Sequence, residues 1–199
     1  MQDIEFDMEG VRASEMMRCL ILLCIHIGGQ RPYEIAASKW TAINWDERTL
    51  LITPDLSKNK RSHLVPLTDS AMSILRRLRE RESSSPFIFP HYKGENDHVR
   101  LDSLSQTIAR YRDDHPHFEH FIPRDLRRTC KTLMGELGIS KALRDRLQNH
   151  ALNDVSSKHY DRYEYLVEKR EALKVWEHKL FNREFASSNL LKFRIERGR

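Results

Sequence analysis

The sequence predicts a mainly helical α+β domain with one small antiparallel sheet near residues 40–67. Apolar residues recur at helical spacing on both sides of that region, whereas inside it the pattern changes to short strand-like runs separated by polar turns. The length of 199 residues suits one sizeable hydrophobic core, and the sequence contains no internal repeat or low-complexity tract.

The first third of the chain predicts a buried helix, a short helix and three strands. Residues 12–27 form the buried helix, because these apolar side chains recur at helical spacing: Met16, Met17, Leu20, Ile21, Leu23, Cys24 and Ile27. The residues GGQRP end it, and Pro32 fits the first position of a short helix, PYEIAASK. WTAINWDERTLLIT predicts two strands around the turn DER, and HLVPL predicts a third after the turn SKNKRS.

The remaining residues predict helices joined by loops. A helix over residues 68–82 has Thr68 or Asp69 as its N-cap, and a loop over 83–97 precedes a helix over 100–114. A second loop, HPHFEHFIP, leads to an amphipathic helix, RDLRRTCKTLMGELG, which Gly138 closes. Ser140 then caps the helix KALRDRLQNH. A further helical stretch carries three tyrosines and continues through YLVEKREALKVWEHKLF.

Composition indicates a soluble, cytoplasmic protein with a basic surface. The formal net charge is +5, from 34 Lys and Arg against 29 Asp and Glu, which suits a polyanionic partner such as nucleic acid. The three cysteines show no CxxC spacing and fit free thiols in a reducing compartment. The longest apolar run, CLILLCIHIGG, is too short to span a bilayer.

Three groups of basic residues are candidates for a phosphate site. Arg124 and Arg127 are three residues apart, hence on one helical face, and follow Pro123 in a first turn whose free N–H groups favour an anion. Arg31 follows two glycines at another helix start, where Glu34 could orient its guanidinium. Lys58 lies in a turn between predicted strands, where a lysine is common for reasons unrelated to function.

The order of these motifs is more specific than any one of them. The chain carries GGQRPYEI, SKNKRSHLVPL, PRDLRRT, LQNH and HYDRY in succession. This succession resembles the tyrosine recombinase (phage integrase) family, which has a TGxRxxE arginine box, a hairpin lysine, an HxxR box, a GH pair and then a tyrosine. The resemblance implies that the catalytic residues are Arg31, Lys58, Arg124, Arg127, His150 and Tyr160.

The resemblance also implies an activity and a domain organisation. Tyr160 would attack a DNA phosphate and form a 3′-phosphotyrosyl link, so that double-stranded DNA is cleaved and rejoined without a metal or another cofactor. Residues 1–180 would form the catalytic domain, 181–199 a basic tail that could dock on a neighbouring subunit, and the family's amino-terminal DNA-clamping domain would be absent. The full-length protein would act as a tetramer on DNA.

Two departures from the family pattern affect the expected chemistry. Arg124 occupies the position of the HxxR histidine, and arginine cannot serve as a general base. Deprotonation of Tyr160 would then fall to another group, such as His150, or to water. The interval from His150 to Tyr160 is one residue longer than usual, and Asn149 replaces the glycine of the GH pair.

Three alternative functions are compatible with parts of the sequence. Arg124 favours a DNA-binding relative that does not cleave. His115, His117 and His120, with Glu119 among them, suggest a metal-dependent hydrolase, although their spacing is not a zinc signature. The apolar and basic tail from Phe181 to Arg199 suggests an interaction module.

Overall fold

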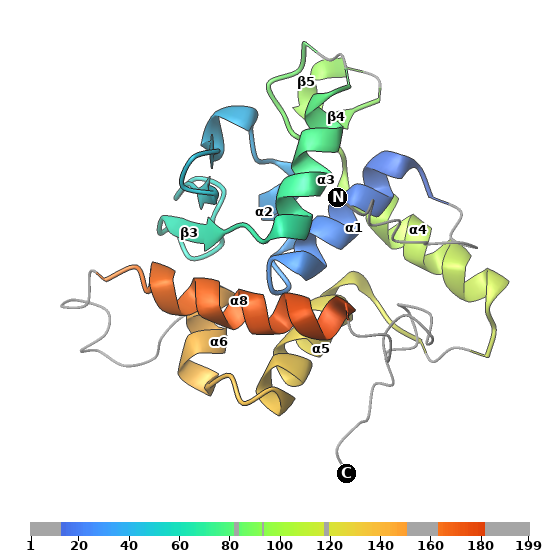
Figure 1. The fold of residues 1–199 in the computed structure, drawn as a ribbon. Coiled ribbons are helices and arrows are strands. Elements are labelled where there is room, and N and C mark those ends of the chain that lie inside the picture. The colour runs from blue at the N-terminus through green and yellow to red at the C-terminus, as the bar shows by residue number, and fades with distance from the viewer. Residues whose placement is uncertain (1–12, 82–83, 93, 118–119, 151–162, 182–199) are drawn as a thin grey trace.

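The computed structural model describes residues 13–81, 84–92, 94–117, 120–150 and 163–181 (Figure 1). Its elements confirm the predicted mainly helical class with small antiparallel sheets. In chain order they are α1 (Glu15–His26), α2 (Pro32–Ala36), the short 3-10 helix η1 (Trp40–Ala42), β1 (Ile43–Asn44), β2 (Thr49–Ile52), β3 (His63–Pro66), α3 (Asp69–Arg79), β4 (Pro90–His91), β5 (Gly94–His98), α4 (Leu101–Asp114), α5 (Pro123–Glu136), α6 (Lys141–Leu147) and α8 (Leu166–Phe181).

Helix α1 lies at the centre of the core and contacts α2, α3, α4, α5 and α8. Every residue from Cys19 to His26 is buried, as the apolar pattern predicted. Trp176 of α8 is fully buried, and its Nε1 donates a 2.9 Å hydrogen bond to the Ile25 carbonyl, which fixes α8 across α1. Although α1 is strongly apolar, no helix in the described ranges is long and apolar enough to cross a membrane.

The sheet predicted between residues 40 and 67 is present, with strand order β1-β2-β3 and antiparallel pairing throughout. Leu50 pairs with Val65 and Ile52 with His63, and all four side chains are buried against the helices. Residues 53–62 connect β2 to β3 and carry Lys58 toward the amino terminus of α2.

The loop predicted over residues 83–97 is wrong in part, because β4 and β5 form an antiparallel hairpin there. Pro90 pairs with His98 and His91 with Gly94. The hairpin lies at the surface, so its strands need no alternation of apolar and polar side chains. Without that alternation the sequence shows no strand pattern, and the hairpin could not be predicted from it.

The predicted helix caps at Thr68, Gly138 and Ser140 are confirmed. The Thr68 Oγ1 accepts a hydrogen bond from the Ala71 N–H at 3.2 Å, and the Ser140 Oγ accepts one from the Leu143 N–H at 3.3 Å. Gly138 has φ +79°, a left-handed conformation that ends the α5 turn and redirects the chain into α6.

The helix predicted to carry all three tyrosines is corrected by the structure. Tyr163 and Tyr165 precede α8 in non-helical backbone, and Tyr165 has φ +52°, which an α-helix cannot contain. Its ring packs 3.7 Å from the Arg146 guanidinium, a contact that sequence spacing could not show. Tyr160 lies outside the described residues. Helix α6 also ends earlier than predicted, at Leu147.

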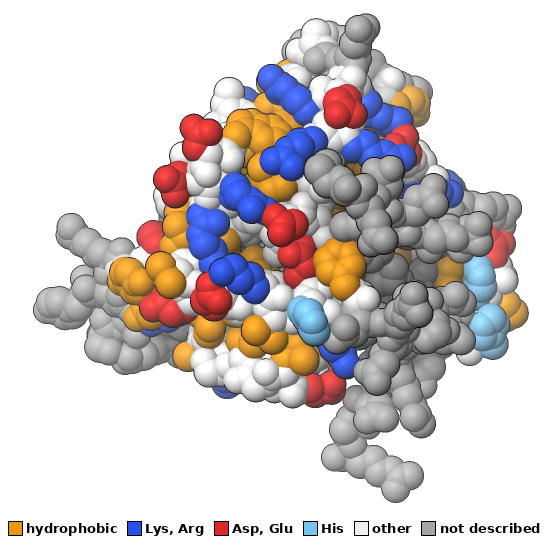
Figure 2. All heavy atoms as spheres, in the orientation of Figure 1, with side chains coloured by type: hydrophobic (Ala, Val, Ile, Leu, Met, Phe, Trp, Pro, Cys, Tyr) orange, Lys and Arg blue, Asp and Glu red, His pale blue; other side chains and the backbone are white. Residues whose placement is uncertain are grey.

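Basic side chains gather over α3 on the face shown in Figure 2, where the last turn of the helix carries Arg76, Arg77 and Arg79. Glu15, at the start of α1, forms ion pairs with Arg77 and Arg81. These contacts link the ends of two neighbouring helices, but they are exposed and contribute little to stability.

His63 should make the stability of the fold depend on pH. Its Nε2 lies 3.1 Å from the Leu147 carbonyl, and burial, followed by the charge of Lys169, lowers its pKa to about 3. Between that pKa and about 6.5 the unfolded chain binds a proton that the folded chain does not, so stability decreases as pH falls through this window.

We expect His63→Gln, which keeps a donor toward Leu147 but cannot titrate, to reduce this pH dependence. Between pH 7 and pH 5 the variant should lose about 2 kcal/mol less unfolding free energy than the unmodified protein, because one titrating group is removed. Urea unfolding at both pH values measures the difference, with the exposed His117→Gln as the matched substitution. Equal losses in both proteins would contradict this role of His63.

Candidate active site

Arg31 and Glu34 form the ion pair that the sequence suggested. Arg31 is the N-cap residue of α2, and Pro32 occupies the first helical turn. The Arg31 Nη1 donates to the Glu34 Oε1 at 3.1 Å, and its Nη2 donates to the Asn149 carbonyl at 3.1 Å. The Glu34 side chain is 2% exposed and that of Arg31 is 20% exposed, so the carboxylate is buried while part of the guanidinium stays accessible.

The turn that carries Lys58 is fastened to the same place. The Lys58 N–H donates to the Glu34 Oε1 at 3.0 Å, so one carboxylate holds both Arg31 and the turn. The Asn59 Nδ2 donates to the Asn149 carbonyl at 2.6 Å, and the Asn149 Nδ2 donates to the Ser57 Oγ at 3.0 Å. These contacts fix the turn while the Lys58 side chain remains exposed.

Arg127 is buried in α5 and held by main-chain carbonyls. Its Nη1 donates to the Gly29 carbonyl at 2.7 Å, and its Nη2 donates to the Gln148 carbonyl. Burial, and then the charge of Arg31, lower the pKa of Arg127 to about 10, which still leaves it charged at neutral pH. Two of its five N–H donors are engaged in this way, so the guanidinium is oriented before any ligand binds.

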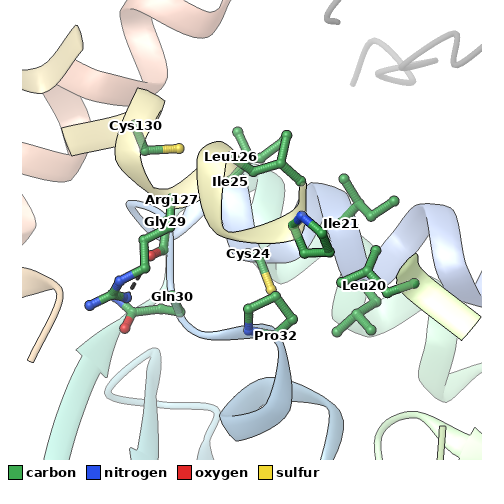
Figure 3. Close-up of a pocket in the computed structure, with 12 residues that line it drawn as sticks. Leu20, Ile21, Cys24, Ile25, Gly29, Gln30, Pro32, Leu126, Arg127 and Cys130 are labelled. Carbon is green, nitrogen blue, oxygen red and sulfur yellow. Dashed lines mark hydrogen bonds between the residues drawn. The ribbon is translucent and has the colours of Figure 1, made fainter. Parts of the chain in front are cut away.

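Gly29 makes this arrangement possible, as Figure 3 shows where its carbonyl meets Arg127. Its φ is +78°, and an added Cβ would lie 2.8 Å from the Cys130 Cβ and 2.9 Å from the Gln148 Nε2. Figure 3 also shows Cys24 and Cys130 beside a small apolar cavity of about 10 Å³. Burial raises the pKa of both thiols, that of Cys130 to about 12, so they are packing groups rather than nucleophiles.

Arg124 differs from Arg127 in its surroundings. It is exposed in the first turn of α5, and within the described part of the chain its guanidinium has no hydrogen-bond or ion-pair partner. Asp125 caps this helix instead, since its Oδ2 accepts the Ile122 N–H at 3.0 Å. The two arginines lie three residues apart, as predicted, but their side chains have different surroundings. The Arg127 guanidinium is buried, whereas that of Arg124 is exposed to solvent.

His150 follows α6 and is surrounded by groups that the sequence did not single out. Its Nδ1 lies 3.0 Å from the Lys131 Nζ and 3.3 Å from the Asp145 Oδ1. Burial, and then the charges of Arg127 and Lys131, lower its pKa, so His150 is neutral at pH 7. The Lys141–Asp145 pair is readable as an (i, i+4) spacing, whereas Lys131 reaches Asp145 only through the packing of α5 on α6.

A pocket of about 280 Å³ opens beside His150. It is formed by the β2–β3 turn, the end of α6 and the chain leading into α8, with Asn59, Arg61, Asn149, His150, Tyr163 and Tyr165 in its lining.

The six predicted site residues divide into two groups. The structure brings the Lys58 turn, Arg31, Arg127 and His150 together, whereas Tyr160 lies outside the described residues and Arg124 is placed on the exposed side of α5.

The loop histidines do not assemble a metal site in the part of the chain that the structure describes. No group of three or more His, Cys, Asp or Glu side chains lies close enough there to hold an ion. His115 instead stacks on Tyr111, with ring centroids 4.1 Å apart, and its Nδ1 lies 2.9 Å from the Tyr111 carbonyl.

Sequence comparisons identify related proteins. The model of the phage integrase family matches residues 5–165. Prophage integrase IntA of Escherichia coli is 25% identical over 146 residues, which cover 73% of this chain and 34% of that protein. Prophage integrase IntZ of the same organism is 30% identical over 80 residues, covering 40% and 19%. The chain thus matches about a third or less of the length of these curated relatives.

Solved structures show the same fold. The integrase from mycobacterium phage Brujita has a TM-score of 0.64 and 22% identity, over 84% of this chain and 53% of that one. The XerH site-specific recombinase bound to difH substrate has a TM-score of 0.57 and 22% identity, over 84% and 49%. These similarities confirm the predicted tyrosine-recombinase catalytic-domain fold.

Gly29→Ala should destabilise the protein through the contacts around Arg127. The positive φ costs about 1–2 kcal/mol for any L side chain, and crowding against Cys130 and Gln148 adds about 1–3 kcal/mol. Gly138→Ala is the matched control, since Gly138 has the same positive φ with open space around it and should lose only the first contribution. Denaturant unfolding measures both, and equal losses would show that the close approach at Gly29 is unimportant.

Proposed function

The chain belongs to the phage integrase family, and from that premise we propose that it is the catalytic domain of a site-specific recombinase that cleaves and rejoins double-stranded DNA. The intermediate is a 3′-phosphotyrosyl link on Tyr160. The observation that carries this proposal is the convergence of four separate segments. The buried Glu34 carboxylate holds both Arg31 and the Lys58 turn. Arg127 and Arg31 donate to the carbonyls of Gln148 and Asn149, the two residues that precede His150.

The cationic groups suit a phosphodiester whose negative charge increases in the transition state. Arg31 and Arg127 keep N–H donors that their protein contacts do not use, and Arg124 adds an exposed guanidinium at a helix amino terminus. Because Arg31 and Arg127 are oriented before DNA binds, they stabilise the transition state without reorganisation.

The covalent step requires a nucleophile, a leaving group and two proton transfers. The Tyr160 oxygen attacks phosphorus, and the bond from phosphorus to the 5′-oxygen breaks. Lys58 donates a proton to that leaving oxygen, while the phenol proton passes to His150 or to water. The phosphotyrosyl bond conserves the energy of the broken bond, so rejoining needs no metal and no nucleotide.

The partner of this site is double-stranded DNA, bound chiefly through its phosphates. The full-length protein would assemble as a tetramer on DNA, with residues 1–180 as the catalytic domain and the basic tail 181–199 docking on a neighbouring subunit. Most of that tail lies outside the described residues.

Tyr160→Phe should bind DNA but form no covalent adduct, because only the attacking oxygen is removed. A nicked suicide substrate, from which the cleaved end diffuses away, traps the adduct as a denaturation-resistant protein–DNA band. Tyr163→Phe is the matched control, since the Tyr163 side chain is exposed and its Oη donates to Glu168 at 3.2 Å. An adduct with Tyr160→Phe but none with Tyr163→Phe would show that the nucleophile is assigned to the wrong tyrosine.

A second candidate function is DNA binding without cleavage, which the arginine at position 124 favours. On this alternative, the unmodified protein binds the suicide substrate without forming an adduct, and Arg124→His restores adduct formation by supplying a group that accepts protons. On the main proposal, the unmodified protein forms the adduct and Arg124→Ala slows it by about 10-fold or more through loss of a phosphate contact. Filter binding at matched salt separates affinity from covalent chemistry in both cases.

A further inference from the structure

The Nδ1 atom of His150 faces two groups of opposite charge. The Lys131 Nζ, from α5, lies 3.0 Å away, and the Asp145 Oδ1, from α6, lies 3.3 Å away. Lys131 also contacts Asp145 directly, and Lys141 donates to the other carboxylate oxygen at 2.9 Å. The Asp145 carboxylate therefore already has two ammonium partners before His150 is considered.

The shorter contact determines which ring nitrogen carries the proton. An ammonium group has only donors, so a nitrogen 3.0 Å from it must offer a lone pair. A proton on Nδ1 would instead point at the Lys131 hydrogens. Neutral imidazole has one N–H, and that N–H must then be at Nε2.

We propose that Lys131 is a positioning residue, whose ammonium holds His150 in the tautomer protonated at Nε2, so that His150 presents a hydrogen-bond donor to the scissile phosphate and not a base to Tyr160. The identity of the ligand in this inference rests on the proposed function. The tautomer itself does not, because it follows from contacts in the free protein.

Two arginines near His150 act in the same direction as Lys131, and one carboxylate opposes them. Arg127 of α5 and Arg31, which precedes α2, both disfavour an imidazolium, whereas Asp145 of α6 favours it. Burial opposes the ionisation of Asp145, but hydrogen bonds from Lys131 and Lys141 lower its pKa to about 2. The carboxylate is thus ionised throughout the range in which histidine titrates, and its charge is largely balanced by the two lysines.

This arrangement decides between the two acceptors considered for the Tyr160 proton. The only lone pair of neutral His150 is at Nδ1, where Lys131 occupies it. The phenol proton must therefore pass to water or to another group. The Nε2–H is then available to an oxygen of the phosphate, which adds a neutral donor to the arginines.

Lys131→Met, which preserves the length of the side chain and removes its donors, tests the inference in the absence of DNA. Nitrogen chemical shifts of the imidazole ring report the tautomer and pKa, and His150→Gln identifies the signals. The unmodified protein should show Nε2–H at pH 7. In the variant, Nδ1–H facing Asp145 should appear, and the pKa of His150 should rise, because the charge of Lys131 no longer disfavours the imidazolium.

Lys141→Met is the matched control, because Lys141 pairs with the same carboxylate but does not reach His150. It should leave the proton at Nε2, and Lys131→Arg, which restores a donor, should do the same. A Nδ1–H tautomer in the unmodified protein, or an unchanged tautomer in Lys131→Met, would overturn the inference.

The pH dependence of adduct formation gives a second readout that a purely structural defect would not move. At low pH the variant's His150 is an imidazolium, which again carries Nε2–H, and the variant should approach the unmodified rate. At pH 8.5 the misplaced proton should slow Lys131→Met by about 10-fold or more. A ratio of the two rates that stays constant with pH would contradict the inference.

The two experiments also distinguish the inference from the proposed function. If no protein forms an adduct but the chemical shifts change as stated, the positioning role of Lys131 stands and the cleavage activity fails. If adducts form but the shifts show Nδ1–H, the cleavage activity stands and the positioning role fails.

Discussion

The hydrogen bonds from Arg127 to the carbonyls of Gly29 and Gln148 are the interaction on which the site depends. They join α5 to the end of α1 and the end of α6. The Gln148 Nε2 completes the connection by donating to the Gly28 and Arg127 carbonyls, both at 3.0 Å. A buried guanidinium is costly unless its donors are satisfied, so this network fixes the three segments relative to one another.

Because α5 and the ends of α1 and α6 are fixed, Arg31 and the Lys58 turn are also held in place. The segment after α6 supplies the Asn149 carbonyl, which accepts from both Arg31 and Asn59 and so connects α2 with the Lys58 turn. Asn149 itself has φ +49°, an unfavourable conformation that asparagine tolerates better than most residues. The glycine more usual at this position in the family would adopt it freely, which explains why asparagine is an acceptable replacement.

The packing of these segments also sets the balance of positive and negative charge in the site. Glu34 and Asp145 are two acidic groups that contact site cations directly, and each is held by more than one donor. Neither carboxylate is free to neutralise the face that a phosphate would approach. The site therefore keeps an excess of positive charge while its buried groups remain satisfied.

The sequence by itself determined the helices with strong apolar periodicity, the β1–β3 sheet, the caps at Thr68 and Ser140, and the motif order that identified the family. These features depend on residues close together in the chain, where spacing records which face is buried. The β4–β5 hairpin, the non-helical backbone at Tyr163 and Tyr165, and the burial of Arg127 beside an exposed Arg124 were decided by tertiary structure. Tertiary structure also decided the contact of Lys131 with His150. These residues are 19 positions apart, and they can form a hydrogen bond only after helices α5 and α6 have packed together.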